Sequence, residues 1–185
     1  CENKLGDAGA ALLADGLKSA CCKLTLLSIT RNQLGSGAAM ALGPALAQSA
    51  APLEMLDLEE NNLDDTAAIM LGQGLRGKQQ LSALYLSTNR LTAAGCVALV
   101  DALKSCPKLA TLRLSENKVG DMGVSAVSMW LSESSCALTE VTLNQSDVGE
   151  PGATALANAL RVNTRLTVLD VNAKSGSKAV MGVAG

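Results

Sequence analysis

The sequence predicts an α/β solenoid, a right-handed superhelix of strand–helix units with a concave parallel sheet and convex helices. Three observations lead to this prediction. A leucine pattern recurs every 28 or 29 residues, an asparagine recurs at one place in it, and two leucines spaced four apart follow each copy. Repeats of this length are typical of solenoids, in which each unit buries its apolar face against its neighbours.

The leucine pattern begins six times along the chain. In "LEMLDLEENNL" (residues 53–63) the framework positions are separated by variable ones. The N-terminal "CENKLGDAG" matches only the second half of the pattern. Five complete units, with partial units at the two ends, therefore account for residues 1–172. The six copies start at Leu24, Leu53, Leu81, Leu109, Leu138 and Leu166.

Each unit is expected to open with a short strand and a turn. In residues 81–91, Leu84 and Leu86 are two positions apart and should share one face of the strand. A side-chain amide in the following turn can bond backbone groups of adjacent units that a buried bend would leave unpaired. The asparagines at this place are Asn32, Asn61, Asn89 and Asn117.

Each unit is expected to close with a helix, because residues four apart lie on one helical face. Helices are about 10 Å wide and strands about 4.8 Å apart, so the stack must curve with its sheet on the inside. The leucine pairs that predict these faces are Leu13/Leu17, Leu42/Leu46, Leu71/Leu75, Leu99/Leu103 and Leu156/Leu160.

The repeated LxxLxLxxNxL motif resembles leucine-rich repeats of the ribonuclease-inhibitor subfamily, as found in ribonuclease inhibitor, NOD-like receptors and Ran GTPase-activating protein. The resemblance covers residues 1–172 and implies a non-enzymatic protein-interaction scaffold. In residues 173–185, Lys174 takes the asparagine place and Gly176 the leucine place. We expect an irregular C-terminal segment or a degraded last repeat there. The first residue is not Met and no capping unit precedes Asn3, so we also expect a fragment of a larger protein.

The composition argues against several functional classes. Histidine is absent, the net charge is −2, and the basic residues are scattered rather than clustered. The commonest general base and zinc ligand is therefore missing, and no basic face is offered to nucleic acid. No apolar run approaches the roughly 20 residues of a membrane span. We expect no catalytic residue, no cofactor, no metal, no nucleic-acid or membrane partner and no small-molecule substrate.

The cysteines predict a reducing compartment. Six are present, without a CxxC pair. Cys21, Cys22 and Cys136 fall at comparable loop positions four units apart, and Cys96 and Cys106 near opposite ends of one helix. Those separations are too long for a disulfide, so the thiols should be free and the protein cytoplasmic.

The stretch "LEMLDLEENNLDD" (residues 53–65) is the most acidic part of the chain. Its carboxylates occupy variable places that hold Ser, Thr, Tyr or Arg in the neighbouring units, so they should lie on the concave surface. Asp57 and Glu59 should point outward together and could hold a divalent cation. A solvated or partner-facing acidic patch is the favoured interpretation. Asp64 and Asp65 should favour the start of a helix.

Tyr85 and Arg113 take the place of Asp57 in the next two units, so the three side chains should form a row. Tyr and Arg are enriched in binding hot spots, and the row is therefore a candidate recognition patch. Chance occupation of ordinary surface positions is the alternative. The candidate partner-binding residues are Glu54, Asp57, Glu59, Glu60, Tyr85, Arg113 and Glu116.

Two further features of the sequence suggest functions other than protein binding. A GTPase activator resembling Ran GTPase-activating protein would act from loop-edge residues, with Lys4, Arg90 and Lys118, each directly after the repeated Asn, as the basic residues of interest. The stretch "GQGLRGKQ" (residues 72–79) imitates a phosphate-binding loop. Such loops run from a strand into a helix, whereas this one should end a helix, so nucleotide binding is not expected.

Trp130 is the exception in a helical place that otherwise holds Gly or Ala, including Gly16 and Gly74. The small residues indicate close helix packing. The indole must either repack the helix locally or swing to the rim, where with Met122 and Met129 it would form an apolar contact surface. Local repacking is the favoured interpretation.

Overall fold

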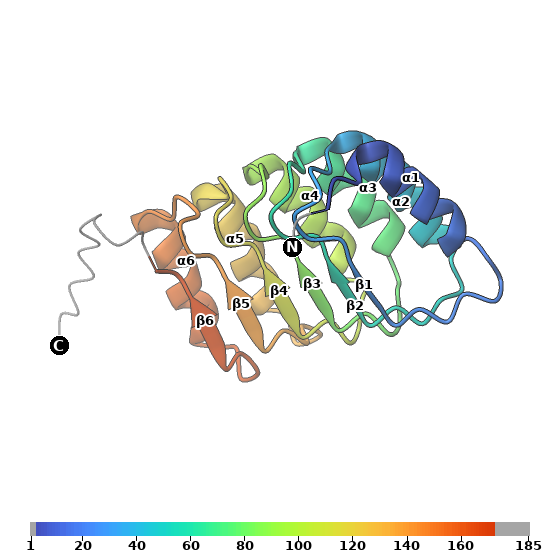
Figure 1. Cartoon of the computed structure of the whole chain (residues 1–185). Coiled ribbons are helices and arrows are strands. Elements are labelled where there is room, and N and C mark those ends of the chain that lie inside the picture. Colours follow the sequence, from blue (N-terminus) through green and yellow to red (C-terminus); the bar gives the residue numbers. More distant parts are fainter. Residues whose placement is uncertain (1–2, 173–185) are drawn as a thin grey trace.

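The computed structural model describes residues 3–172, in which six strands alternate with six helices (Figure 1). The strands are β1 (Leu26–Ser28), β2 (Met55–Asp57), β3 (Ala83–Tyr85), β4 (Thr111–Arg113), β5 (Glu140–Thr142) and β6 (Val168–Asp170). The helices are α1 (Gly6–Leu17), α2 (Ser36–Gln48), α3 (Asp65–Leu75), α4 (Ala93–Leu103), α5 (Gly120–Leu131) and α6 (Glu150–Leu160). Residues 173–185, where we expect an irregular segment or degraded repeat, lie outside the described part.

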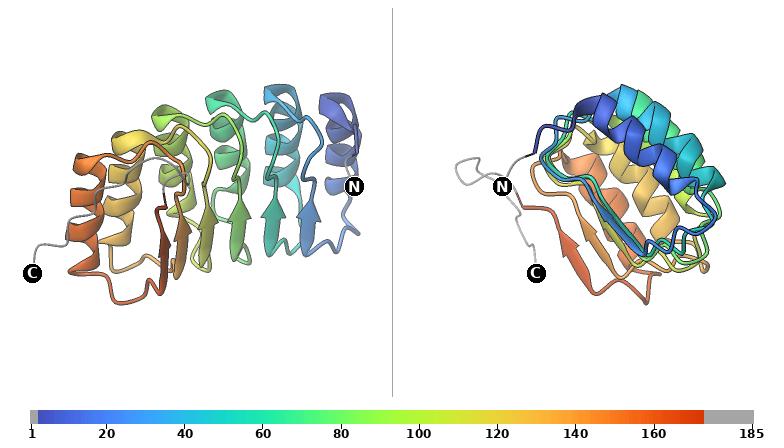
Figure 2. Two further views of the ribbon diagram at one scale, coloured as in Figure 1. Left: turned by 60° about the vertical axis from the view of Figure 1, so that its left-hand side comes forward. Right: turned by 45° about the vertical axis from the view of Figure 1, so that its right-hand side comes forward.

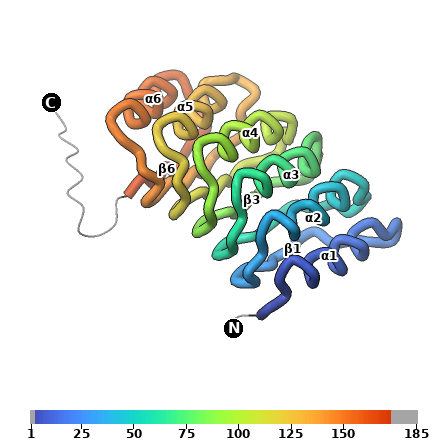
Figure 3. The backbone as a smooth tube through the Cα atoms, turned by 90° about the horizontal axis from the view of Figure 1, so that it is seen from above, coloured from blue at the N-terminus to red at the C-terminus, as the bar shows by residue number. Residues whose placement is uncertain are grey.

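All six strands form one parallel sheet in the order β1 to β6. The sheet makes one layer of the solenoid and the helices make the other (Figure 2). Seen from above, the helices follow one another in chain order along the stack (Figure 3). The predicted α/β solenoid is confirmed. Each strand is only three residues long, and β3 ends at Tyr85. Leu86 was expected inside the strand but follows it, although it is fully buried like Leu84.

The framework leucines of the inner units form the core. Leu42, Leu71 and Leu99 are each 0–1% exposed, which confirms the helical face that the leucine spacing predicts. The prediction is wrong for Leu13 and Leu160, which are 40% and 45% exposed. Both lie in the outermost helices of the described solenoid, which pack against a helix on one side only. Burial in a solenoid depends on the neighbouring unit and not on the leucine alone.

The repeated asparagines join adjacent units, as predicted. The amide oxygen of Asn61 accepts hydrogen bonds from the backbone N–H groups of Asn32 and Leu34, both at 3.0 Å. Its amide nitrogen donates to the carbonyl oxygens of Ile29 at 2.9 Å and Leu58 at 3.1 Å. Asn89 and Asn117 make similar links one and two units later, but each accepts from one backbone N–H, that of Leu63 or Leu91. These side chains supply partners for backbone groups at the buried turns.

Ser146 occupies the asparagine place in the fifth unit and makes fewer hydrogen bonds to the backbone than Asn61 does. Its hydroxyl donates to the carbonyl oxygens of Leu114 at 3.3 Å and Asn144 at 3.2 Å. It accepts no backbone N–H among the described residues. The serine therefore supplies only part of the bonding that an asparagine gives this turn.

Close helix packing explains the small residue at Gly74 but not the one at Gly16, where a Cβ atom would meet nothing within 4 Å. A Cβ atom on Gly74 would overlap the backbone carbonyl of Gly43 in the preceding helix. Trp130, at the same place in α5, is only 2% exposed and belongs to the core cluster. The helix has therefore repacked around the indole, and the alternative of a rim position is wrong. Met122 and Met129 remain 74% and 68% exposed.

A second set of polar links joins the helix starts. Asp64 caps α3 as expected, accepting from the backbone N–H of Ala67 at 2.9 Å. Asp65 instead reaches the next unit, where its carboxylate accepts from the backbone N–H of Thr92 at 2.7 Å and the Thr92 hydroxyl at 2.6 Å. Asp7 and Asp121 bond the N–H groups of Gly35 and Gly149 in the same way, both at 2.7 Å. This link recurs in every second unit.

Replacing Asp65 with alanine should lower the free energy of unfolding by about 1 kcal/mol, because two bonds to the next unit are lost at an exposed site. Asp101→Ala is the matched control. Asp101 forms an exposed ion pair with Arg76 at 2.9 Å, and such pairs contribute about 0–1 kcal/mol. Urea denaturation followed by circular dichroism measures both variants. Equal losses would show that Asp65 forms no stabilising link.

Candidate partner-binding surface

The concave surface consists of the strands with one residue before and up to three after each. It comprises residues 25–31, 54–60, 82–88, 110–116, 139–145 and 167–172. Along its centre, strand register places Asp57 beside Tyr85 and Tyr85 beside Arg113. The predicted row is therefore formed. Ser28 extends the row at one end, where its hydroxyl donates to the Asp57 carboxylate at 3.2 Å.

Arg113 is held in place by two neighbours. Its guanidinium carbon lies 4.3 Å from the centroid of the Tyr85 ring, a cation–π contact. Nε and Nη2 both lie 3.0 Å from Oε1 of Glu140, on the adjacent strand. Desolvation is the largest influence on the pKa of Arg113 and would lower it. The hydrogen bond and charge of Glu140, with smaller contributions from Tyr85 and Glu59, outweigh it and raise the pKa overall.

Glu140 was not among the predicted site residues. It lies on β5, one strand beyond Arg113, and at the place aligned with Thr111 rather than with Arg113 itself. A diagonal between neighbouring strands is within reach of long side chains. The repeat alignment could have predicted this pair, but only if residues diagonal to each other on adjacent strands had been compared. Tyr85, Arg113 and Glu140 together form a cluster of contacting side chains on the concave surface, the Tyr85–Arg113–Glu140 cluster.

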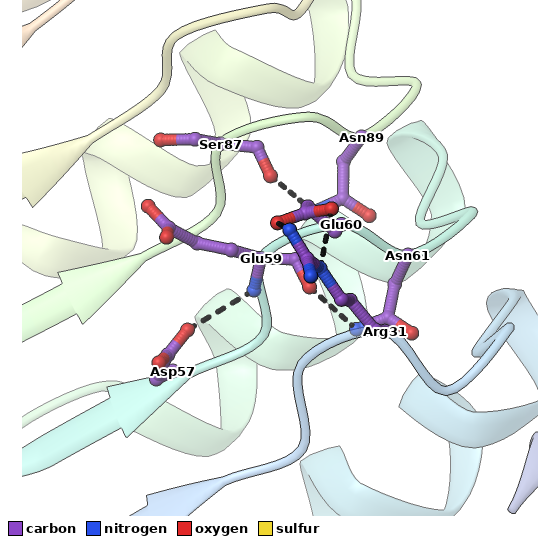
Figure 4. A network of polar contacts seen from close by, with 7 residues as sticks. All are labelled: Arg31, Asp57, Glu59, Glu60, Asn61, Ser87 and Asn89. Carbon is purple, nitrogen blue, oxygen red and sulfur yellow. Dashed lines mark hydrogen bonds and ion pairs between the residues drawn. The ribbon is translucent and has the colours of Figure 1, made fainter. Parts of the chain in front are cut away.

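Glu60 is neutralised by Arg31 of the preceding unit (Figure 4). Nε of Arg31 lies 2.6 Å from Oε2, and Nη2 lies 2.6 Å from Oε1. The hydrogen bond from Arg31 is the main reason why the pKa of Glu60 is lowered. Both residues adopt positive φ angles, 57° and 54°, in a column that includes Thr88, Glu116 and Gln145. The sequence predicted neither the positive φ angles of this column nor the Arg31–Glu60 ion pair.

The other carboxylates of the acidic stretch have no cationic partner within the described residues. Asp57 accepts from the backbone N–H of Glu59 at 3.2 Å (Figure 4) and from Ser28. Asp57 and Glu59 are half-buried, and Glu54 is exposed. No group of three or more metal-ligating side chains occurs in residues 3–172. Glu54, Asp57 and Glu59 therefore carry negative charge that no ion pair within residues 3–172 offsets.

Charge is distributed unevenly over the molecule. The concave surface carries seven carboxylates and two guanidinium groups, whereas the rest of the chain carries ten acidic and thirteen basic side chains. Both concave arginines are paired with glutamates of the same surface. The carboxylates are Glu54, Asp57, Glu59, Glu60, Glu116, Glu140 and Asp170. A nearly neutral protein thus has an acidic inner face.

Glu116 lies apart from the central row, at the loop edge. It is exposed and borders an open groove of about 560 Å³ together with Arg90, Lys118, Gln145 and Asp147. The structure therefore brings together two of the three basic residues considered for a GTPase activator. Lys4 lies three units before Arg90 and does not line this groove.

Comparison with known proteins agrees with this architecture. A family model described as "Leucine Rich repeat" matches residues 20–43 and 105–128, two segments that lie three repeats apart. The fold is similar to actin-binding site 2 of leiomodin-1, with a TM-score of 0.57 and 17% identity over 89% of this chain and 78% of that one. The chain has the α/β solenoid fold of leucine-rich-repeat proteins. No curated protein sequence matches it significantly.

A second similar leucine-rich-repeat structure is an internalin, InlF, of Listeria monocytogenes. Its TM-score is 0.51 and its identity 18%, over 89% of this chain and 46% of that chain. The chain thus spans less than half of the internalin structure. Likeness at such identities shows the fold alone, and the ribonuclease-inhibitor subfamily stays a prediction.

The glycine-rich stretch (residues 72–79) has a structural role. Gly72 and Gly74 lie inside α3, and Gly77 ends the turn after it with a φ of 74°. Nζ of Lys78 donates to the carbonyl oxygen of Ser49 in the preceding unit at 2.8 Å. Desolvation is the main reason why the pKa of Lys78 is lowered, while the nearby Cys106 acts in the opposite direction. The chain runs from helix to strand here, the reverse of a phosphate-binding loop.

Proposed function

We propose that this chain is a non-enzymatic scaffold that binds a protein partner through its concave surface. The observation that supports the proposal is that one face carries both the excess of carboxylates and the Tyr85–Arg113–Glu140 cluster. Tyr and Arg are over-represented among residues that dominate binding energy, and complementary charge favours encounter and specificity. The interacting residues would be those of the central row and the neighbouring carboxylates.

The similar structures support the same class of function. Actin-binding site 2 of leiomodin-1 is, by its name, a region that binds another protein. We infer a protein partner by analogy, while the partner of this chain need not be the same. Nucleic acid and membrane surfaces are poorer matches, because both are anionic and the concave surface is acidic. No helix in residues 3–172 is long and apolar enough to cross a membrane.

A cytoplasmic location is part of the proposal. Five cysteines lie in the described residues, and all five are free thiols. Free thiols are typical of proteins that work in a reducing compartment. The GTPase-activator alternative is less well supported, because Lys4 lies three units before Arg90 and does not line the groove that Arg90 and Lys118 share.

Affinity capture from lysate of the source cells tests the proposed surface. The concave variant combines Asp57→Lys, Tyr85→Ala and Arg113→Ala. The matched convex variant combines Asp101→Lys, Met129→Ala and Arg161→Ala, whose side chains are exposed on helices or just after one. Circular dichroism checks that both variants fold. We expect the same partner with the wild type and the convex variant, and about a tenfold or greater loss with the concave variant.

The opposite pattern would overturn the proposal. If the folded concave variant captures the partner as well as the wild type does, binding lies elsewhere, at the loop edge near Glu116 or on the convex side near Met122 and Met129. If the convex variant alone loses the partner, the helical side is the binding surface.

A further inference from the structure

An apolar column crosses the concave surface directly beside the acidic row. Strand register aligns Leu26 with Met55 and Met55 with Ala83. Met55 and Asp57 flank the fully buried Leu56, so both point to the concave side of β2. Leu26 is 50% exposed and Met55 is partly exposed. Ala83, the third member of the stripe, is only 5% exposed. The first three strands therefore present an apolar stripe that runs across them.

Carboxylates border this stripe on both sides. Along β2, Glu54 precedes Met55, and Asp57 and Glu59 follow it. At about 3.3 Å per residue, Glu54 and Asp57 are separated by about 10 Å along the strand, with the methionine between them. No cation pairs with any of the three among the residues that the structure describes. An apolar stripe edged by free negative charge is complementary to an apolar stripe edged by positive charge.

The spacing of the strands selects the shape of the segment that would fit. Side chains on one face of an α-helix recur about every 5.4 Å, close to the 4.8 Å between neighbouring strands. A helix lying across the strands can therefore place one apolar side chain over each of β1, β2 and β3. An extended segment repeats its side chains about every 6.8 Å and loses register after two strands.

We propose that the concave surface over β1–β3 binds an amphipathic helix of a protein partner, with Lys or Arg residues on both borders of its apolar face. The inference rests on the proposed function and specifies the chemistry of the partner. The helix places its apolar side chains on Leu26, Met55 and Ala83, and its cations beside Glu54, Asp57 and Glu59. The Arg113–Glu140 pair beyond Tyr85 closes the site on the side of β4.

Fluorescence anisotropy with three synthetic peptides tests this proposal on the full chain. The first probe is a Leu/Lys peptide with leucines at helical spacing and lysines on both flanks. The second carries Glu in place of every Lys. The third has the composition of the first in scrambled order, which removes the apolar stripe. We expect the first probe to bind at least about tenfold more tightly than the other two, and to weaken between about 50 mM and 500 mM salt.

Two charge variants locate the binding site. Glu54→Lys/Asp57→Lys/Glu59→Lys should weaken the first probe by about tenfold or more, because three attractive charges become repulsive. Asp15→Lys/Asp101→Lys/Glu133→Lys changes the net charge equally on the helical side and should leave the affinity within about twofold. A single Met55→Gln variant should weaken the probe several-fold at high salt, where the charges are screened.

Five results would overturn the proposal. Equal binding of the scrambled peptide would show that charge alone attracts the probe, and equal binding of the Glu peptide would remove the charge argument. Equal losses in the two charge variants would place the probe elsewhere. A dimer of the wild type that excludes the probe and dissociates with the concave charge variant would show that a second copy covers the stripe. If no probe binds while the Asp57/Tyr85/Arg113 variant still loses its captured partner, the helix proposal fails and the proposed function stands.

Discussion

Replacing Asn61 with alanine should lower the free energy of unfolding by about 3–4 kcal/mol, a large share of the stability of a small domain. The amide is 8% exposed and serves five backbone groups in two units. Alanine leaves the N–H groups of Asn32 and Leu34 without their acceptor in a place where water is largely excluded. Each buried group that loses its partner costs about 1–3 kcal/mol, and partial relaxation of the turn reduces the total.

Two variants calibrate the effect of Asn61. Asn62→Ala is the matched control, because Asn62 is the next residue, is half-buried and makes no side-chain hydrogen bond to any described residue. Its loss should stay within about 0.5 kcal/mol. Asn61→Ser copies the natural Ser146 turn and should cost about half as much as alanine, since a hydroxyl can replace some of the donated bonds.

Urea denaturation followed by circular dichroism gives all three values. A loss below about 1 kcal/mol for Asn61→Ala would show that water replaces the amide, and that the repeated asparagine is not a main support of the turns.

The prediction of the fold from sequence succeeded because its signals are periodic. Leu56, Leu84 and Leu112 are each fully buried and aligned in adjacent strands, as their spacing of 28 residues requires. The asparagine turns were predictable for the same reason, since the asparagine recurs at one place in successive units and its amide bonds the turn of the preceding unit. Leu13 and Leu160 deviate because the pattern identifies the inward face of a helix but not whether another unit covers it.

The candidate site was predictable in its positions and not in its contacts. Register alone places Asp57, Tyr85 and Arg113 in one row. Which charge pairs with which depends on side-chain conformation and on diagonal neighbours, so the Arg113–Glu140 pair was not foreseen. This pairing bears on the proposed function. Arg113 is already paired with Glu140, and the carboxylates without an ion pair in the described residues are others, namely Glu54, Asp57 and Glu59.

The aspartate links between helix starts show a signal that could have been found. Asp7, Asp65 and Asp121 stand at the same place in alternate units. A single aspartate at a helix start is explained by the helix dipole, and Asp65 was interpreted in that way. The recurrence in every second unit is better explained by a bond to the following unit, as the contacts of Asp65 with Thr92 demonstrate.

Alkaline pH should destabilise the protein through its buried thiols, with Cys96 as the strongest case. Burial is the main reason why the pKa of Cys96 is raised to about 12, and the nearby Asp65 carboxylate adds to the effect. The unfolded chain ionises this thiol near the ordinary value of 9. Between those two values the unfolded state has lost the proton and the folded state has kept it. Stability from this group is complete below about pH 9 and falls as the pH rises toward 12.

The expected size follows from one proton per molecule. The free energy of unfolding should fall by about 1.4 kcal/mol for each pH unit in that window, or about 2–3 kcal/mol between pH 9 and pH 11. Cys106 and Cys136 also have raised pKa values, mainly because of burial, and they steepen the dependence for the whole protein. The contribution of Cys96 is therefore the difference in slope between the wild type and a Cys96→Ala variant, measured by urea denaturation at several pH values.

The alanine variant separates packing from ionisation. Removing the thiol leaves a small cavity and should cost about 1 kcal/mol at every pH. That constant loss is independent of proton binding, so the two stability curves should converge above pH 9 and cross near pH 10, where the wild type has lost as much through ionisation as the variant lost through packing. Cys21, which is exposed, provides the control. A Cys21→Ala variant should keep the wild-type slope, and parallel curves for Cys96→Ala would mean that the Cys96 thiol ionises as readily in the folded chain as in the unfolded one.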